Sequence, residues 1–169
     1  MKNMAMHILD LTGNSISAGA NLIKVYITED YYTNIFTITV TDNGCGIDEK
    51  DLYNAFNPFY TTKNKETGLG LSLFKNSCEK SGGSVKIESV KNKGTRVTGT
   101  LDTANVNCIS EGNIINTLAT IAVTNPQADF IFKIHRDDYK SMLDTRIFKK
   151  RENIEFLSIG NYSKLLNEL

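Results

Sequence analysis

The stretch TDNGCGIDEKDLYNAFNPFYTTKNKETGLGLSLF, residues 41 to 74, decides how this chain is interpreted. It contains two Gly-x-Gly turns, with Asp42 just before the first and a Thr-Thr-Lys run between them. Glycines at such turns let a ligand approach the backbone closely. The first turn is not a dinucleotide fingerprint, because Glu49 stands where a third glycine is needed, and the chain has no G-x-x-x-x-G-K-[ST] run. Rossmann and P-loop nucleotide sites are therefore excluded.

Length and composition favour one soluble domain with an extension. The 169 residues carry 19 Lys and Arg against 19 Asp and Glu, so no charge excess indicates nucleic acid or a membrane surface as partner. The three cysteines form no C-x-x-C pair, which argues against a disulfide framework and a zinc site. No run approaches the ~18 apolar residues of a membrane span. We expect a cytoplasmic protein.

Hydrophobic periodicity predicts the order α, β, β, α, α, β, β over the first hundred residues. Helical spacing is found over residues 3 to 19, 48 to 56 and 69 to 80. Strand-like segments rich in β-branched residues are 22 to 29, 35 to 41, SVKIESV and TRVTGTL. A polar connector, residues 102 to 112, follows. We predict domains at 1–103 and 104–169, the second with a helix near 113–123, strands near 129–135 and 139–144, and a helix near 154–168.

Three polar side chains share one face of the first predicted helix. His7, Asp10 and Asn14 are spaced i, i+3 and i+7. The amide oxygen of Asn14 suits a hydrated Mg²⁺, and Asp10 one turn earlier could deprotonate a water. Taken alone, the same stripe is also ordinary for an exposed helix.

The two glycine turns each have two interpretations. Asp42 ends a strand, where its carboxylate could accept a hydrogen bond from an amine such as that of adenine, although Asp-Asn-Gly is also common turn chemistry. The second turn, Gly68 and Gly70, opens a helix whose free N–H groups favour phosphate. Between Lys63 and Arg96, eight basic residues stand against three acidic ones, which agrees with an anion site.

Taken together, these segments resemble the GHKL superfamily of gyrase, Hsp90, histidine kinases and mismatch-repair ATPases. DLTGNSISAGA is similar to the N box, TDNGCGID to the first glycine box, and NPFYTTK to the F box and lid. TGLGLSLFKNSCEKSGGSVKIES is similar to the second glycine box, and KGTRVTGTL to the closing strand. The resemblance covers residues 7 to 101. It implies an α+β fold, a two-layer α/β sandwich of the Bergerat type with a mixed, mainly antiparallel sheet, followed here by an α-β-β-α extension.

The resemblance also implies a site for ATP and Mg²⁺. Asn14 would bind the metal, Asp42 the adenine amine, and Asp10 would stand where hydrolysing members carry a glutamate base, with a shorter reach. The residues that the resemblance places around ATP are Asn14, Asp42, Gly44, Gly46, Ile47, Thr62, Lys63, Gly68, Leu69, Gly70, Leu71 and Thr95.

Two classes of function stay open. As an enzyme, the protein would be a regulatory ATPase or a kinase for a partner protein, as the anti-sigma-type kinases of this superfamily are. As a binding module, it would change a partner interface on binding nucleotide, with little or no catalysis. We expect a stand-alone ATP-binding protein without the two-helix phosphoacceptor domain of a histidine kinase, and a protein partner or a homodimer. The apolar positions of 104–169 predict packing against the ATPase domain, with a dimer or partner interface as the alternative.

Overall fold

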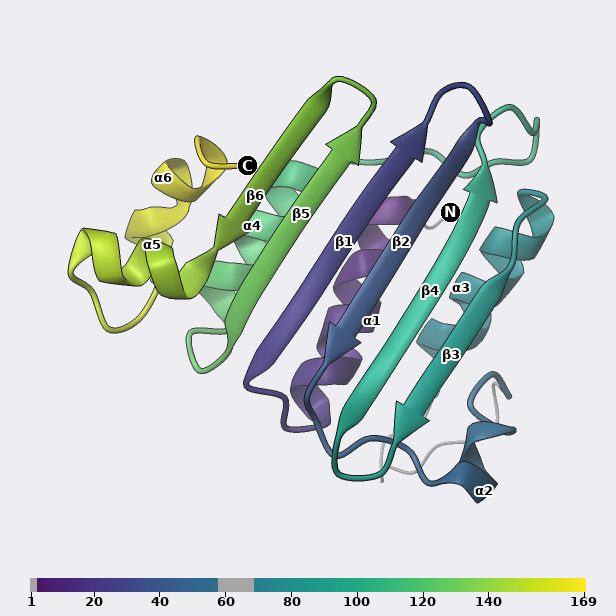
Figure 1. Cartoon of the computed structure of the whole chain (residues 1–169), viewed down its shortest axis with the longest axis horizontal. Helices are drawn as coiled ribbons and strands as arrows, with labels where there is room; N and C mark the ends of the chain where they lie inside the picture. Colours follow the sequence, from purple (N-terminus) through teal and green to yellow (C-terminus); the bar gives the residue numbers. More distant parts are fainter. Residues whose placement is uncertain (1–2, 58–68) are drawn as a thin grey trace.

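The computed structural model describes residues 3–57 and 69–169. Its elements follow the predicted order from α1 to β6 (Figure 1). They are α1 Met4–Ser17, β1 Leu22–Asp30, β2 Ile35–Asp42, α2 Glu49–Leu52, α3 Leu69–Lys80, β3 Val85–Val90, β4 Gly94–Asp102, α4 Ile114–Thr124, β5 Asp129–Arg136, β6 Tyr139–Asp144, α5 Thr145–Glu152, the 3-10 turn η1 Ile159–Asn161 and α6 Tyr162–Leu166.

The strands form one six-stranded sheet in the order β3-β4-β2-β1-β5-β6. Only the β1–β5 pair among these neighbours is parallel, and the other four pairs are antiparallel. Helices α1, α3 and α4 all lie on the same face of the sheet (Figure 1). The structure therefore confirms the predicted two-layer α+β architecture with a mixed, mainly antiparallel sheet.

The alternation of side chains along the strands decides which face the helices cover. In β1 and β2, every second residue is apolar and buried, while threonines and charged residues dominate the intervening positions. Successive side chains of a strand point to opposite faces, so one face becomes the core and the other meets solvent. The buried positions of these two strands are Ile23, Val25, Ile27, Phe36, Ile38 and Val40.

The C-terminal segment continues the same sheet. β5 pairs with β1 in register from Leu22↔Asp129 to Glu29↔Arg136, and α4 packs against α1. Its strand β5 contributes three core side chains, Phe130, Phe132 and Ile134. Packing of this segment against the first hundred residues is therefore confirmed as the structural role of its apolar positions.

The predicted terminal helix at 154–168 is present only in part, as η1 and the short α6. The structure also has a helix that was not predicted, α5 at Thr145–Glu152. The Asp144 side chain caps α5 by accepting from the Arg146 N–H at 3.0 Å, and Asn153 ends the helix in the left-handed conformation at φ 52°. The basic run 149–151, which its charges alone would predict to be a solvated loop, occupies the last turn of α5, where cations interact favourably with the helix dipole.

Among the described residues, no helix combines the length and apolar character needed to cross a bilayer.

Candidate nucleotide site

The Asp42 carboxylate is held by three segments of the chain. It ends β2, and its Oδ1 accepts from the backbone N–H of Gly44 at 2.9 Å and of Thr95 at 3.2 Å. Its Oδ2 accepts from the Ser15 hydroxyl of α1 at 2.7 Å. Hydrogen bonds to a carboxylate are the stronger kind and fix its orientation. The side chain is therefore positioned at the point where α1, β2 and β4 meet.

The first glycine turn packs tightly against the rest of the protein. Gly46 has φ +64°, and a Cβ there would stand 2.1 Å from the carbonyl oxygen of Val90. A Cβ on Gly44 would stand 2.8 Å from the Cβ of Ala18. Only glycine fits both places without a shift of the backbone. At both glycines, the atoms that leave no room for a Cβ belong to neighbouring segments of the protein. This packing shapes the loop that follows Asp42.

A serine that the sequence analysis did not single out joins two of the predicted site residues. The Ser89 hydroxyl accepts from the Ile47 N–H at 2.8 Å and lies 2.8 Å from the Thr95 hydroxyl. It also donates to the Gly94 carbonyl at 3.0 Å. Ser89 thus ties the loop after β2 to the start of β4, where Thr95 also contacts Asp42.

An ion pair fixes the beginning of α2 next to the same loop. The Lys91 ammonium donates to the Asp48 carboxylate at 2.9 Å. This hydrogen bond is the main reason why the pKa of Asp48 lies below its usual value and the pKa of Lys91 above it. The β3–β4 turn and the α2 N-terminus are therefore connected through charges as well as through the packing of Gly46.

The predicted metal and phosphate positions meet between α1 and α3. A Cβ on Gly70 would lie 3.5 Å from the Asp10 Cβ and 3.8 Å from the Asn14 Nδ2, so Gly70 faces the polar stripe of α1. Asn14 is exposed, whereas His7, two turns earlier on α1, is fully buried. Leu69 begins α3 and is exposed, and Leu71 packs against the core.

The structure brings the described site residues to one end of the sheet and helix layer. Asp42, the glycine loop and the start of β4 lie at the same end of the fold as the C-terminus of α1 (Figure 1). Thr62, Lys63 and Gly68 lie outside the described residues. Within residues 3–57 and 69–169, no group of three or more His, Cys, Asp or Glu could hold a metal ion by itself.

Two residues of this site were missed, Ser15 and Ser89. Ser15 occupies a position of α1 that belongs to the buried face, since it is only 3% exposed. A polar residue at a buried helical position needs a hydrogen-bond partner, and this is the signal that could have drawn attention to it. Ser89 lies in an alternating strand pattern and offers no such signal.

Comparisons with known proteins show the family of the chain. Residues 3–105 match the family described as histidine kinase-, DNA gyrase B-, and HSP90-like ATPase. The chain belongs to this family and contains a GHKL ATP-binding module.

Kinases are among the relatives with similar sequences. The chain is 50% identical over 94 residues to sporulation kinase D of Bacillus subtilis, which covers 56% of this chain and 19% of that protein. It is 45% identical over 62 residues to the sensor histidine kinase ZraS of Salmonella typhimurium, covering 37% of this chain and 13% of that protein. The chain thus spans less than a fifth of the length of these two relatives.

A solved structure has a similar fold. The crystal structure of the N-terminal domain of a DNA repair protein superposes with a TM-score of 0.62 and 18% identity, covering 85% of this chain and 53% of that one. Since that match covers more of the chain than residues 3–105, the likeness of fold reaches into the C-terminal segment.

Proposed function

We propose that this protein binds Mg²⁺-ATP at the end of the fold where Asp42 lies and uses it as a regulatory ATPase or as a kinase for a partner protein. The observation that carries the proposal is the fixed Asp42 carboxylate. Three of its four lone-pair positions are used by Ser15, Gly44 and Thr95, so one acceptor position is left for a ligand amine. The exocyclic amine of adenine is such a donor.

The phosphate end of ATP would lie between α1 and α3. Asn14 would bind Mg²⁺ through its amide oxygen, and Gly70 in the first turn of α3 would cradle the phosphates together with Gly68, Thr62 and Lys63. The exposure of Asn14 and the proximity of Gly70 support this arrangement. Mg²⁺ uses few protein ligands and takes the rest from water and phosphate, so a single amide fits it. When bound, the ion would neutralise charge that develops on the phosphates.

Asp10 would act as the general base in a hydrolysing enzyme. Its carboxylate would take the proton of the attacking water while the γ-phosphoryl group leaves ADP. The carbon chain of Asp is one methylene shorter than that of Glu, so the water would have to lie closer to α1. The position of Asp10 opposite Gly70 supports this role.

A nucleotide-gated module with little or no catalysis is the alternative function. It is favoured by the same shorter carboxylate, since a base with less reach would slow hydrolysis while binding stays intact.

A timed assay with γ-labelled ATP on the full chain and on Asp10→Asn tests the proposal. Release of labelled phosphate that falls in Asp10→Asn supports an ATPase, and label on an added partner protein supports a kinase. Tight binding with neither outcome supports the nucleotide-gated module. Absence of ATP binding to the folded protein would refute all three.

A further inference from the structure

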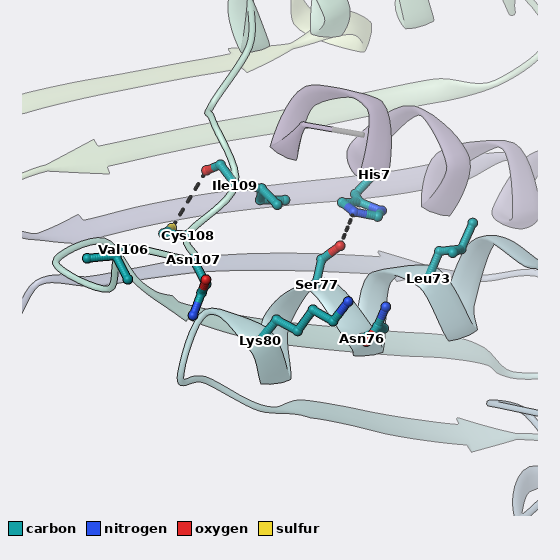
Figure 2. A pocket seen from close by; sticks show the side chains of 9 residues that line it. All are labelled: His7, Leu73, Asn76, Ser77, Lys80, Val106, Asn107, Cys108 and Ile109. Carbon is teal, nitrogen blue, oxygen red and sulfur yellow. Dashed lines mark hydrogen bonds between the residues drawn. The ribbon is translucent and has the colours of Figure 1, made fainter. Parts of the chain in front are cut away.

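A cavity lies at the opposite end of α1 and α3 from Asp42. Its volume is about 450 Å³, which falls in the range of small-molecule pockets. His7 from the first turns of α1, four residues of α3 from Leu73 to Lys80 and the loop residues 106–109 line it (Figure 2). His7 precedes Asn14 by seven residues, or about 10 Å along the helix, so this cavity is separate from the proposed nucleotide site.

The inner wall of the cavity is a preformed contact between the two helices. His7 is fully buried, and its Nε2 lies 2.9 Å from the Ser77 hydroxyl of α3 (Figure 2). The imidazole also packs on the Phe74 ring, with 5.3 Å between the ring centroids. These contacts hold α1 and α3 together at the base of the cavity, so it does not need to form when a ligand arrives.

The His7–Ser77 pair does not make this cavity a hydrolytic centre. Ser77 stands inside α3, where backbone N–H groups are used by the helix itself and cannot form an oxyanion hole. The buried imidazole is also enclosed by Phe74 and Ser77. The pair therefore has a structural role, as part of the inner wall of a binding site.

The rim of the cavity is polar and positively charged. Lys80, Asn76 and Asn107 supply an ammonium group and two amides. The neighbouring acidic residue of α3, Glu79, pairs instead with Lys75 at 3.7 Å. Among residues 3–57 and 69–169, no acidic residue lines the cavity, and Lys80 takes part in none of the ion pairs.

The remaining wall is apolar. Leu73 from α3 and Val106 and Ile109 from the loop line it, and Leu73 and Val106 are exposed to solvent. A ligand that covered these side chains would remove apolar surface from water, which is favourable in proportion to the area covered. The cavity thus combines the ammonium group of Lys80, which has no ion-pair partner in the described part of the chain, with a hydrocarbon surface.

We infer that this cavity is a second ligand site, which takes a small amphipathic anion. The carboxylate or phosphate group of the ligand contacts Lys80, Asn76 and Asn107, and its short hydrocarbon body covers Leu73 and Ile109. Such a ligand bridges α3 and the loop that leads from β4 to α4.

Titration of the full chain with octanoate, followed by ¹H–¹⁵N correlation spectra, tests this inference. Saturable shifts are expected at Asn76, Ser77 and Asn107. Octan-1-ol and octylammonium, which keep the hydrocarbon and lose or reverse the charge, should bind at least several-fold more weakly. Octyl phosphate serves as the second anion, and whichever of the two anions binds more tightly identifies the preferred head group.

Two variants separate the cavity from general surface charge. Lys80→Gln should weaken octanoate binding about threefold to fivefold, as expected for one exposed charge contact. Lys140→Gln removes an exposed charge on β6, far from the cavity, and should leave the affinity unchanged. The inference is overturned if octanoate shifts no cavity residue, or if octylammonium binds as well as octanoate and Lys80→Gln has no effect.

Discussion

Replacing Asp42 by Asn tests the proposed nucleotide site with a change of only one atom. The carboxylate Oδ1 accepts from two backbone N–H groups, and Oδ2 accepts from the Ser15 hydroxyl. An Asn side chain has one oxygen and one NH₂ group. Its oxygen can keep both backbone bonds, and its NH₂ then points toward Ser15 and toward the position where the adenine amine would lie.

The structure separates the expected effects on folding and on binding. The Ser15 hydroxyl can accept from the new NH₂ group, so the fold should lose at most about 1 kcal/mol, the net value of one ordinary hydrogen bond. The adenine amine, in contrast, would meet a donor in place of a charged acceptor. Loss of a hydrogen bond to a charged group costs about 1.5–3 kcal/mol, which corresponds to a roughly 10- to 150-fold weaker ATP affinity.

Isothermal titration calorimetry with ATP and GTP, on the wild type and on Asp42→Asn, measures the change in affinity. The wild type should prefer ATP, and the variant should lose that preference, because the guanine carbonyl can accept from the Asn NH₂ group. Asp102→Asn is the matched control. Asp102 also ends a strand, β4, and its Oδ1 accepts a hydrogen bond from the N–H two residues later at 2.9 Å, as Asp42 does. It lies at the other end of the sheet from Asp42. Unchanged ATP affinity in a folded Asp42→Asn protein would refute the assignment.

Three further predictions concern stability and reactivity. Gly46→Ala should lower the free energy of unfolding by more than about 2 kcal/mol, because φ is +64° and the new Cβ would stand 2.1 Å from a backbone oxygen. A urea midpoint equal to that of the wild type would contradict this prediction. Burial raises the pKa of the Cys78 thiol to about 12, so iodoacetamide at pH ~8 should modify the exposed Cys45 and spare Cys78 until the protein unfolds, as peptide mass spectrometry can show. The hydrogen bond from Arg146 lowers the pKa of Asp144, so its stabilisation is present above the ordinary value of 3.8 and lost as pH falls below it. Urea unfolding should therefore show a cost of Asp144→Asn near neutral pH that shrinks in acid, and a cost independent of pH would be evidence against the ion pair.

Local patterns were sufficient to predict most elements of the first hundred residues, whereas their fold was implied by the resemblance to the GHKL superfamily. The β1–β2 hairpin follows from alternation in both strands, and the turn between them contains Asn34 at φ 56°, a residue that tolerates this conformation. The helix over 69–80 also agrees with α3, which ends at Lys80 just before Gly82 at φ 76°. These features depend on residues a few positions apart, which a sequence displays directly.

The errors arose where a local signal had two interpretations. The basic run 149–151 is typical of a solvated loop and equally of the last turn of a helix, and the Asp144 cap decides for the helix. The partners of the Asp42 carboxylate could not be predicted in full either. Ser15 lies 27 positions before Asp42 and Thr95 lies 53 positions after it, so only the fold shows that they meet.

The parallel β1–β5 pair changes how the predicted boundary at residue 103 should be understood. β1 lies between β2 and β5, so its backbone is hydrogen-bonded on one side to residues before the boundary and on the other side to residues after it. α4 covers α1, the helix that carries Asp10 and Asn14. Removing 104–169 would expose an edge of β1 and one face of α1 at once, and unpaired strand edges favour aggregation. The C-terminal segment therefore supports the candidate site through the strand and helix next to it, although it adds no residue to that site.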